Sequence, residues 1–223
     1  MKWIGGRQST NVDDRRGMSG RGIAVGGGLG GLIIYLIYAL LTGNPAPTQM
    51  DPGGAPTTLT AEEQAADEQR AQFVKTVLAE TEDVWNKIFA EQGADYKEPT
   101  LVLFRDLVQS SCGNASSASG PFYCPMDGKL YIDLSFFEEM QNRFRVEGDF
   151  PMAYVLAHEV GHHVQNLMGT AEKVNRIRQS VGEAEANRYS VMLELQADFY
   201  AGVWANRTHQ MKNNLDEGDI EEA

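Results

Sequence analysis

The sequence predicts an α+β fold in which an N-terminal transmembrane helix precedes a domain with a small sheet and a mostly helical C-terminal half. Three observations predict it. An uncharged apolar run lies at 23–41, two short apolar runs near residues 100 and 130 have the character of strands, and helical periodicity dominates from Pro151 to about Met211. Strands upstream and helices downstream are typical of an α+β domain.

The apolar run, Ile23–Leu41, contains no charged residue. Nineteen residues at helical rise span roughly 29 Å, about the thickness of a bilayer core. A buried core helix and a cleaved signal peptide are the alternatives. The long polar leader and the lack of a small-residue cleavage site argue against cleavage. We therefore expect an uncleaved transmembrane signal anchor over residues 22–42, in contact with the lipid bilayer.

Charge is distributed unevenly around this run. The chain has a net charge of −12, whereas the leader, residues 1–21, carries +3 and the remainder −15. Because positive flanks stay in the cytoplasm, we expect a single-pass membrane protein with a basic cytoplasmic leader and an extracytoplasmic domain. So acidic a domain would repel nucleic acid, which we exclude as a partner.

Two cysteines, Cys112 and Cys124, flank a Gly/Ser-rich stretch. In an oxidising compartment they would form a disulfide that closes a small loop and contributes about 3 kcal/mol. In a cytosol they would be free thiols. An extracytoplasmic domain favours the disulfide.

The domain after the anchor begins with a linker. Residues 43–60 are rich in Pro, Gly and Thr and lack apolar periodicity, as linkers do. Thr60 with Glu63 fits a capping box that opens a helix. We therefore place a single domain at residues 61–223. Within it, Thr100–Arg105 and Lys129–Leu134 are the predicted strands.

The chemistry centres on His158-Glu159-Val160-Gly161-His162, an HExxH pattern. Residues four apart face the same way on a helix, so His158 and His162 can present two nitrogens to one metal ion. Glu159, about 100° around the helix, can reach a water beside that ion and act as general base. The surrounding positions are apolar, and two imidazoles with a carboxylate in such a helix would be costly without a metal.

A zinc peptidase site needs a third protein ligand. Gln165 and Met168 stand where the metzincin extension needs Gly and His, which excludes that class. Glu194 lies 32 residues after His162, and Asp198 follows it on the same helix face. With Glu194 on the metal, Asp198 would hold a ligand histidine by its second N–H. The reverse assignment of these two carboxylates stays open.

These motifs resemble the putative neutral zinc metallopeptidase family of bacteria. The similarity covers nearly the whole chain and is carried by the glycine-rich run and by NVDDRRG at 11–17, CGNASSASGPFYCP at 112–125, YIDLSFF at 131–137, HEVGHHVQ at 158–165 and ELQADFYAGVWA at 194–205. The resemblance implies a zincin-like domain with a gluzincin-like site and a Zn²⁺ cofactor. It implies zinc ligands at His158, His162 and Glu194. It also implies that Glu159 is the base and that Asp198 supports a ligand.

Two functional hypotheses follow. The first is a membrane-anchored zinc metallopeptidase that hydrolyses peptide or protein substrates. The second is a zinc-stabilised, membrane-anchored binding or scaffold protein without proteolytic activity. By analogy with peptidases of this class, Leu130–Leu134 would be an edge strand that pairs with an extended substrate.

Overall fold

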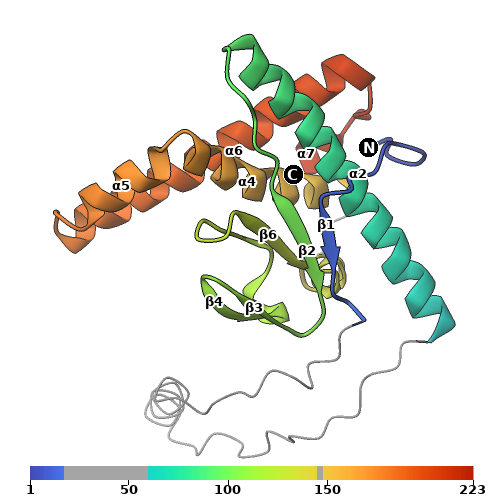
Figure 1. Ribbon diagram of the computed structural model, residues 1–223. Helices are drawn as coiled ribbons and strands as arrows, with labels where there is room; N and C mark the ends of the chain where they lie inside the picture. Colours follow the sequence, from blue (N-terminus) through green and yellow to red (C-terminus); the bar gives the residue numbers. More distant parts are fainter. Residues whose placement is uncertain (18–59, 145–147, 223) are drawn as a thin grey trace, which may run out of the picture.

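The computed structural model describes residues 1–17, 60–144 and 148–222, and Figure 1 shows a small sheet flanked by long helices. The main sheet has the order β1-β2-β6-β5. Its strands are β1 (Val12–Asp14), β2 (Thr100–Phe104), β6 (Lys129–Asp133) and β5 (Phe122–Cys124). The first three run parallel, and β5 runs antiparallel to β6 at the sheet edge. Both predicted strands are confirmed, but β6 lies between β2 and β5, so the predicted edge strand at 130–134 is wrong.

The remaining elements surround this sheet. A hairpin of β3 (Leu107–Ser110) and β4 (Gly113–Ser116) leads into a 3₁₀ turn, Ser117–Ser119. The helices are α2 (Ala61–Glu91), α3 (Ser135–Phe144), α4 (Phe150–Leu167), α5 (Thr170–Arg178), α6 (Glu183–Lys212) and α7 (Asp219–Glu222). The capping box of Thr60 and Glu63 opens α2 as predicted. Figure 1 shows α5 and the adjoining part of α6 extending beyond the sheet.

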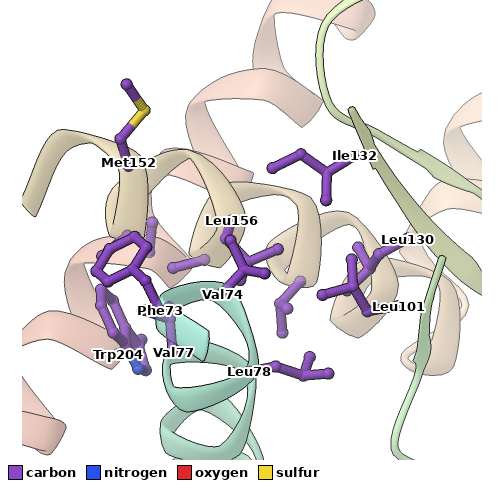
Figure 2. Close-up of a cluster of buried hydrophobic side chains, with 14 of the residues drawn as sticks. Phe73, Val74, Val77, Leu78, Leu101, Leu130, Ile132, Met152, Leu156 and Trp204 are labelled. Carbon is purple, nitrogen blue, oxygen red and sulfur yellow. The ribbon is translucent and has the colours of Figure 1, made fainter. Parts of the chain in front are cut away.

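The core lies between one sheet face and the helices α2, α4 and α6. Figure 2 shows the side chains that meet there: Phe73, Val74, Val77, Leu78, Leu101, Leu130, Ile132, Met152, Leu156 and Trp204. Alternate residues of the same strands, such as Val102 and Tyr131, pack on the opposite face against the β3–β4 hairpin. With both faces covered, the sheet is a fixed support for α4.

The N-terminal leader belongs to this folded unit. Its strand β1 pairs with β2. The indole Nε1 of Trp3 donates to Asp149 at 2.8 Å, next to the start of α4. The Arg16 guanidinium forms an ion pair with Asp67 of α2 at 2.7 Å. Residues 1–17 therefore pack on the same side as the helices that follow residue 60.

This packing corrects the predicted membrane topology. The anchor at 22–42 lies outside the described residues, and among the helices at 1–17, 60–144 and 148–222 none combines the length and apolar character needed to span a bilayer. A single crossing between residues 17 and 60 would also put the leader and the domain on opposite sides, although they share one sheet. The expectation of a cytoplasmic leader with an extracytoplasmic domain, and of an N-terminal transmembrane helix in the fold class, is therefore wrong. The fold is a mixed α/β arrangement with a small sheet.

A buried carboxyl group on α2 gives the fold a pH-dependent contribution. Glu80 is 4% exposed, and its Oε1 accepts from Asn214 Nδ2 at 3.0 Å. Burial raises the pKa of Glu80, and the nearby Lys212 ammonium and Asn214 amide oppose that rise. Oε2 of Glu80 and Oδ1 of Asn214 are buried acceptors without a hydrogen-bond partner. A proton on Glu80 would therefore place a hydrogen-bond donor among groups that lack one.

We predict that Glu80→Gln stabilises the protein increasingly as pH rises. A carboxyl group whose folded pKa is raised stabilises the fold fully below its unfolded pKa, and this contribution is lost as pH rises through the folded pKa. Glutamine is neutral at every pH and avoids that loss. Denaturant unfolding of the variant and the wild type between pH 4 and pH 8 measures the difference in their free energies of unfolding. Glu91→Gln, at an exposed position of the same helix, is the control. If both variants change the free energy of unfolding by the same amount at each pH, the prediction is contradicted.

Candidate metal centre

Helix α4 positions the two histidines of the HExxH pattern. Pro151 stands in its first turn, where a missing N–H costs no hydrogen bond, and Leu156, Ala157 and Val160 bury its inner face. His158 and His162 lie one turn apart, with ring centroids 4.8 Å apart and ring planes at 88°. Both side chains are only about one-fifth exposed.

Helix α6 crosses α4 and brings a carboxylate to these rings. Oε2 of Glu194 lies 3.3 Å from Nε2 of His158 and 3.4 Å from Nε2 of His162. Potential ligand atoms of the three residues lie within 4.8 Å of one another. The structure therefore brings together the three residues that the sequence singled out, from two helices and over 36 positions of sequence.

A second layer of contacts fixes the ring orientations. Nδ1 of His158 lies 2.8 Å from Oδ1 of Asp198, and Nδ1 of His162 lies 2.9 Å from Oε1 of Gln165. Both partners are acceptors, so in the neutral imidazole the proton is on Nδ1 and Nε2 keeps a free lone pair. Two lone pairs and a carboxylate oxygen then converge on one point. A cation bound at that point would be attracted by all three groups.

Gln165 is a site residue that the sequence reasoning missed. It is 1% exposed, and its Nε2 donates to the Leu193 carbonyl at 2.7 Å and to Gln196 Oε1 at 3.1 Å. These bonds determine which end of the amide faces His162. The sequence feature that could have identified it is its position three residues after His162, which places both side chains on the same helix face. Gln165 ties a candidate ligand on α4 to the backbone of α6.

The donor set fits a zinc ion. Zinc bonds to imidazole nitrogen and carboxylate oxygen at about 2.0–2.2 Å, so adjacent ligand atoms of a tetrahedral site lie about 3.4 Å apart. The separations of 3.3 and 3.4 Å from Glu194 to the two histidines match this spacing. Glu194 is 60% exposed on its side chain, which leaves the site open to a substrate.

Glu159 follows His158 directly in the chain and is half-buried. Burial raises its pKa to about 8, the backbone N–H of Tyr123 donates toward the carboxylate and opposes the rise, and the charge of Glu194 adds to it. A carboxylate with a raised pKa takes up a proton more readily, as a general base at neutral pH requires.

The third histidine of α4 and the two cysteines do not take part in this cluster. His163 is buried and bonds to the Lys97 carbonyl through Nε2, at 2.6 Å, and to the Tyr123 hydroxyl through Nδ1, at 3.1 Å. Cys112 and Cys124 form a disulfide, as predicted for an oxidising compartment, and it ties the β3–β4 hairpin to β5. A polar hollow of about 410 Å³ contains none of the predicted metal ligands; it is lined by Arg15, Gln109, Ser110, Ser111, Asp127, Lys129 and Tyr131.

Gly161 permits the close approach of the two ligand-bearing helices. A Cβ atom at this position would lie 2.8 Å from the carbonyl oxygen and 3.0 Å from the Cα of Ala197. Both obstacles are backbone atoms, which cannot rotate away. Ala197 lies between Glu194 and Asp198, so any added volume at Gly161 pushes these carboxylates away from the histidines.

Gly161→Ala is therefore predicted to destabilise the protein by about 1–3 kcal/mol, the usual effect of overpacking, and to weaken metal binding. Gly202→Ala on α6 is the matched control, since a Cβ there meets nothing within 4 Å and alanine favours the helix. Thermal unfolding and zinc titration of both variants test this. Equal behaviour of the two variants would contradict the close-approach argument.

Comparisons with known proteins assign the chain to a family. The profile of the family described as "Putative neutral zinc metallopeptidase" matches residues 1–223. The chain is 42% identical over 241 residues to uncharacterized protein YpfJ of Escherichia coli K12, covering all of this chain and 80% of that protein. It is 47% identical over 111 residues to uncharacterized protein Rv2575 of Mycobacterium tuberculosis, covering 49% of this chain and 36% of that protein. No solved structure matches the chain.

Proposed function

Because the chain belongs to the putative neutral zinc metallopeptidase family, whose cofactor is zinc, we propose that it hydrolyses peptide bonds at the centre formed by α4 and α6. In this proposal His158, His162 and Glu194 hold the ion, and Glu159 is the general base. One observation carries it: Nε2 of His158 and Nε2 of His162 lie 3.3 and 3.4 Å from one carboxylate oxygen of Glu194, beside the half-buried Glu159.

When bound, zinc supplies the Lewis acidity that polarises the scissile carbonyl and makes water easier to deprotonate. Glu159 takes a proton from the attacking water and later delivers it to the amine that leaves. A raised pKa favours both transfers, because the Glu159 carboxylate takes up the proton of the water more readily and then carries it as an acid to the leaving amine.

The supporting residues keep the ligands in place. Asp198 and Gln165 accept the Nδ1 protons of His158 and His162, so both Nε2 atoms stay directed at one point. Asp198 is 47% exposed and points to Nδ1 rather than Nε2 of His158, which favours a supporting role over the reverse ligand assignment. Gln165 also bonds to α6, so the two helices are held in register around the site.

Chelator-reversible proteolysis tests the proposal. The purified protein, loaded with zinc and freed of excess metal, is incubated with a reduced and alkylated unfolded protein, and fragments are identified by mass spectrometry. We expect cleavage that a chelator stops and added zinc restores. A preparation that retains about one zinc per chain but cleaves no unfolded protein would instead support a zinc-stabilised binding function.

A further inference from the structure

The polar hollow lies on the sheet face that the β3–β4 hairpin covers, opposite the face that packs on α4. Tyr131 belongs to this hairpin face, and Lys129, two residues earlier on β6, shares it because side chains alternate along a strand. The volume of about 410 Å³ is in the range of small-molecule sites. All seven residues that line the hollow have polar side chains. The hollow therefore suits a small polar ligand rather than an apolar one.

Asp127, the one acidic residue among the described residues that line the hollow, has its oxygens occupied by the protein itself. Its Oδ2 accepts from the Ser111 backbone N–H at 3.0 Å and from the Tyr131 hydroxyl at 2.8 Å. Its Oδ1 accepts from the Lys129 backbone N–H at 3.1 Å. Burial raises the pKa of Asp127, but these hydrogen bonds outweigh it and hold the pKa below its ordinary value. The carboxylate thus ties together the segments around the hollow, and its acceptors are already in use.

Two cationic side chains also line the hollow, and they keep donors to spare. The Arg15 guanidinium donates to Oδ2 of Asp13 through Nε at 2.9 Å and Nη2 at 2.6 Å. Within residues 1–17, 60–144 and 148–222, neither Nη1 of Arg15 nor the Lys129 ammonium has a hydrogen-bond or ion-pair partner. The Arg15 side chain lowers the pKa of Asp13 and the charge of Lys129 adds to this, so both cations lie near one carboxylate.

These charges favour an anionic ligand. Arg15 and Lys129 against Asp127 give the lining a net charge of +1, in a chain of net charge −12. Because Asp13 offsets much of the Arg15 charge, Lys129 is the principal cation for a ligand. Arginine and lysine donors suit the oxygens of a carboxylate or a phosphate group.

The remainder of the lining indicates the body of the ligand. The Gln109 side chain is exposed and its amide both donates and accepts, as hydroxyl groups require. Tyr131 is 2% exposed, so the hollow presents no aromatic face on which a nucleotide base could stack. A hydroxylated anion matches both features.

We propose that this hollow binds a small hydroxylated anion, a sugar acid or a sugar phosphate. Its carboxylate or phosphate oxygens pair with Lys129 and Arg15, and one of its hydroxyl groups bonds to Gln109. The site is separate from the metal centre and does not depend on the peptidase function. A neutral sugar lacks the contact to Lys129, and inorganic phosphate lacks the contact to Gln109, so both bind more weakly.

Isothermal titration calorimetry of the zinc-loaded full chain at low ionic strength tests the ligand class. The probes are glucuronate, glucose 6-phosphate, glucose and inorganic phosphate. We expect glucuronate, glucose 6-phosphate or both to bind at least about 3-fold more tightly than glucose and inorganic phosphate, since each of the latter lacks one contact. If no probe binds, or if glucose binds as tightly as the anionic sugars, the proposal is overturned.

Lys129→Gln tests the position of the site. We expect the affinity for the tighter-binding anionic sugar to fall about 10-fold or more, as for a lost hydrogen bond to a charged group. Lys173→Gln on α5 is the matched control, because it removes the same charge at an exposed position outside the hollow. An anion bound to the zinc ion would be unaffected by Lys129→Gln. Such a result, or equal losses in both variants, overturns the proposal.

Gln109→Ala tests the hydroxyl contact at an exposed strand position where the fold tolerates the change. We expect the affinity for the anionic sugar to fall about 3- to 10-fold, and that for inorganic phosphate to stay unchanged. If the variant binds the anionic sugar as tightly as the wild type, or loses affinity for both probes equally, a hydroxylated ligand held by Gln109 is overturned.

Discussion

Glu159→Gln is expected to lower the rate of peptide hydrolysis by about 100- to 10,000-fold, the usual contribution of a general base. Glutamine has nearly the same shape, so α4 and the histidines beside it keep their positions. It cannot take a proton from water, however. Zinc content should therefore stay at the wild-type level while turnover disappears. Elemental analysis and a fragment assay on the same preparation measure the two quantities together.

The control for this substitution is Glu172→Gln on α5. Glu172 is exposed and forms an ion pair with Arg176, one turn later on the same helix, at 3.5 Å. It makes the same chemical change without touching the centre, and we expect full activity. A Glu159→Gln protein that hydrolyses peptides at the wild-type rate would remove Glu159 from the mechanism.

Glu194→Ala is expected to weaken zinc binding by more than about 100-fold. Loss of a supporting contact around a metal ligand already costs about 10- to 100-fold in affinity, and loss of a direct ligand should exceed that. Competition with a chromogenic chelator measures the affinity. Glu185→Ala is the matched control, since Glu185 is an exposed carboxylate on the same helix, two turns or more from the site.

Asp198→Ala, measured alongside, decides between the two carboxylates. If Glu194 is the ligand, Asp198→Ala should weaken zinc binding by about 10- to 100-fold, as expected for a residue that only orients His158. If Asp198→Ala loses more affinity than Glu194→Ala, the roles are reversed. If Glu194→Ala binds zinc as tightly as the wild type, this residue is not a ligand.

Local patterns predicted the parts of this protein that depend on nearby residues. The separation of His158 and His162 sets their common face on one helix, whatever the rest of the chain does. Thr60 and Glu63 likewise satisfy each other's backbone groups within a single turn. Glu194 was found because the later helix has a carboxylate at a suitable position, although its approach to α4 depends on the tertiary fold.

Features that depend on distant contacts were missed. The strand β1 is three residues long and contains two aspartates, and its place in the sheet depends on β2, nearly 90 residues later. The topology prediction relied on the hydropathy of one segment and the charge of its flank, and it could not foresee that the leader packs on α2. Gln165 was missed because an uncharged amide gives no metal-binding signal until both of its partners are known.

Anomalous diffraction at the zinc edge, from crystals of the zinc-loaded protein, tests the central claim most directly. We predict a single strong peak about 2.0–2.2 Å from Nε2 of His158, Nε2 of His162 and a carboxylate oxygen of Glu194. A peak elsewhere in the molecule, or one bonded to neither histidine, would contradict the proposed centre and the peptidase function that rests on it.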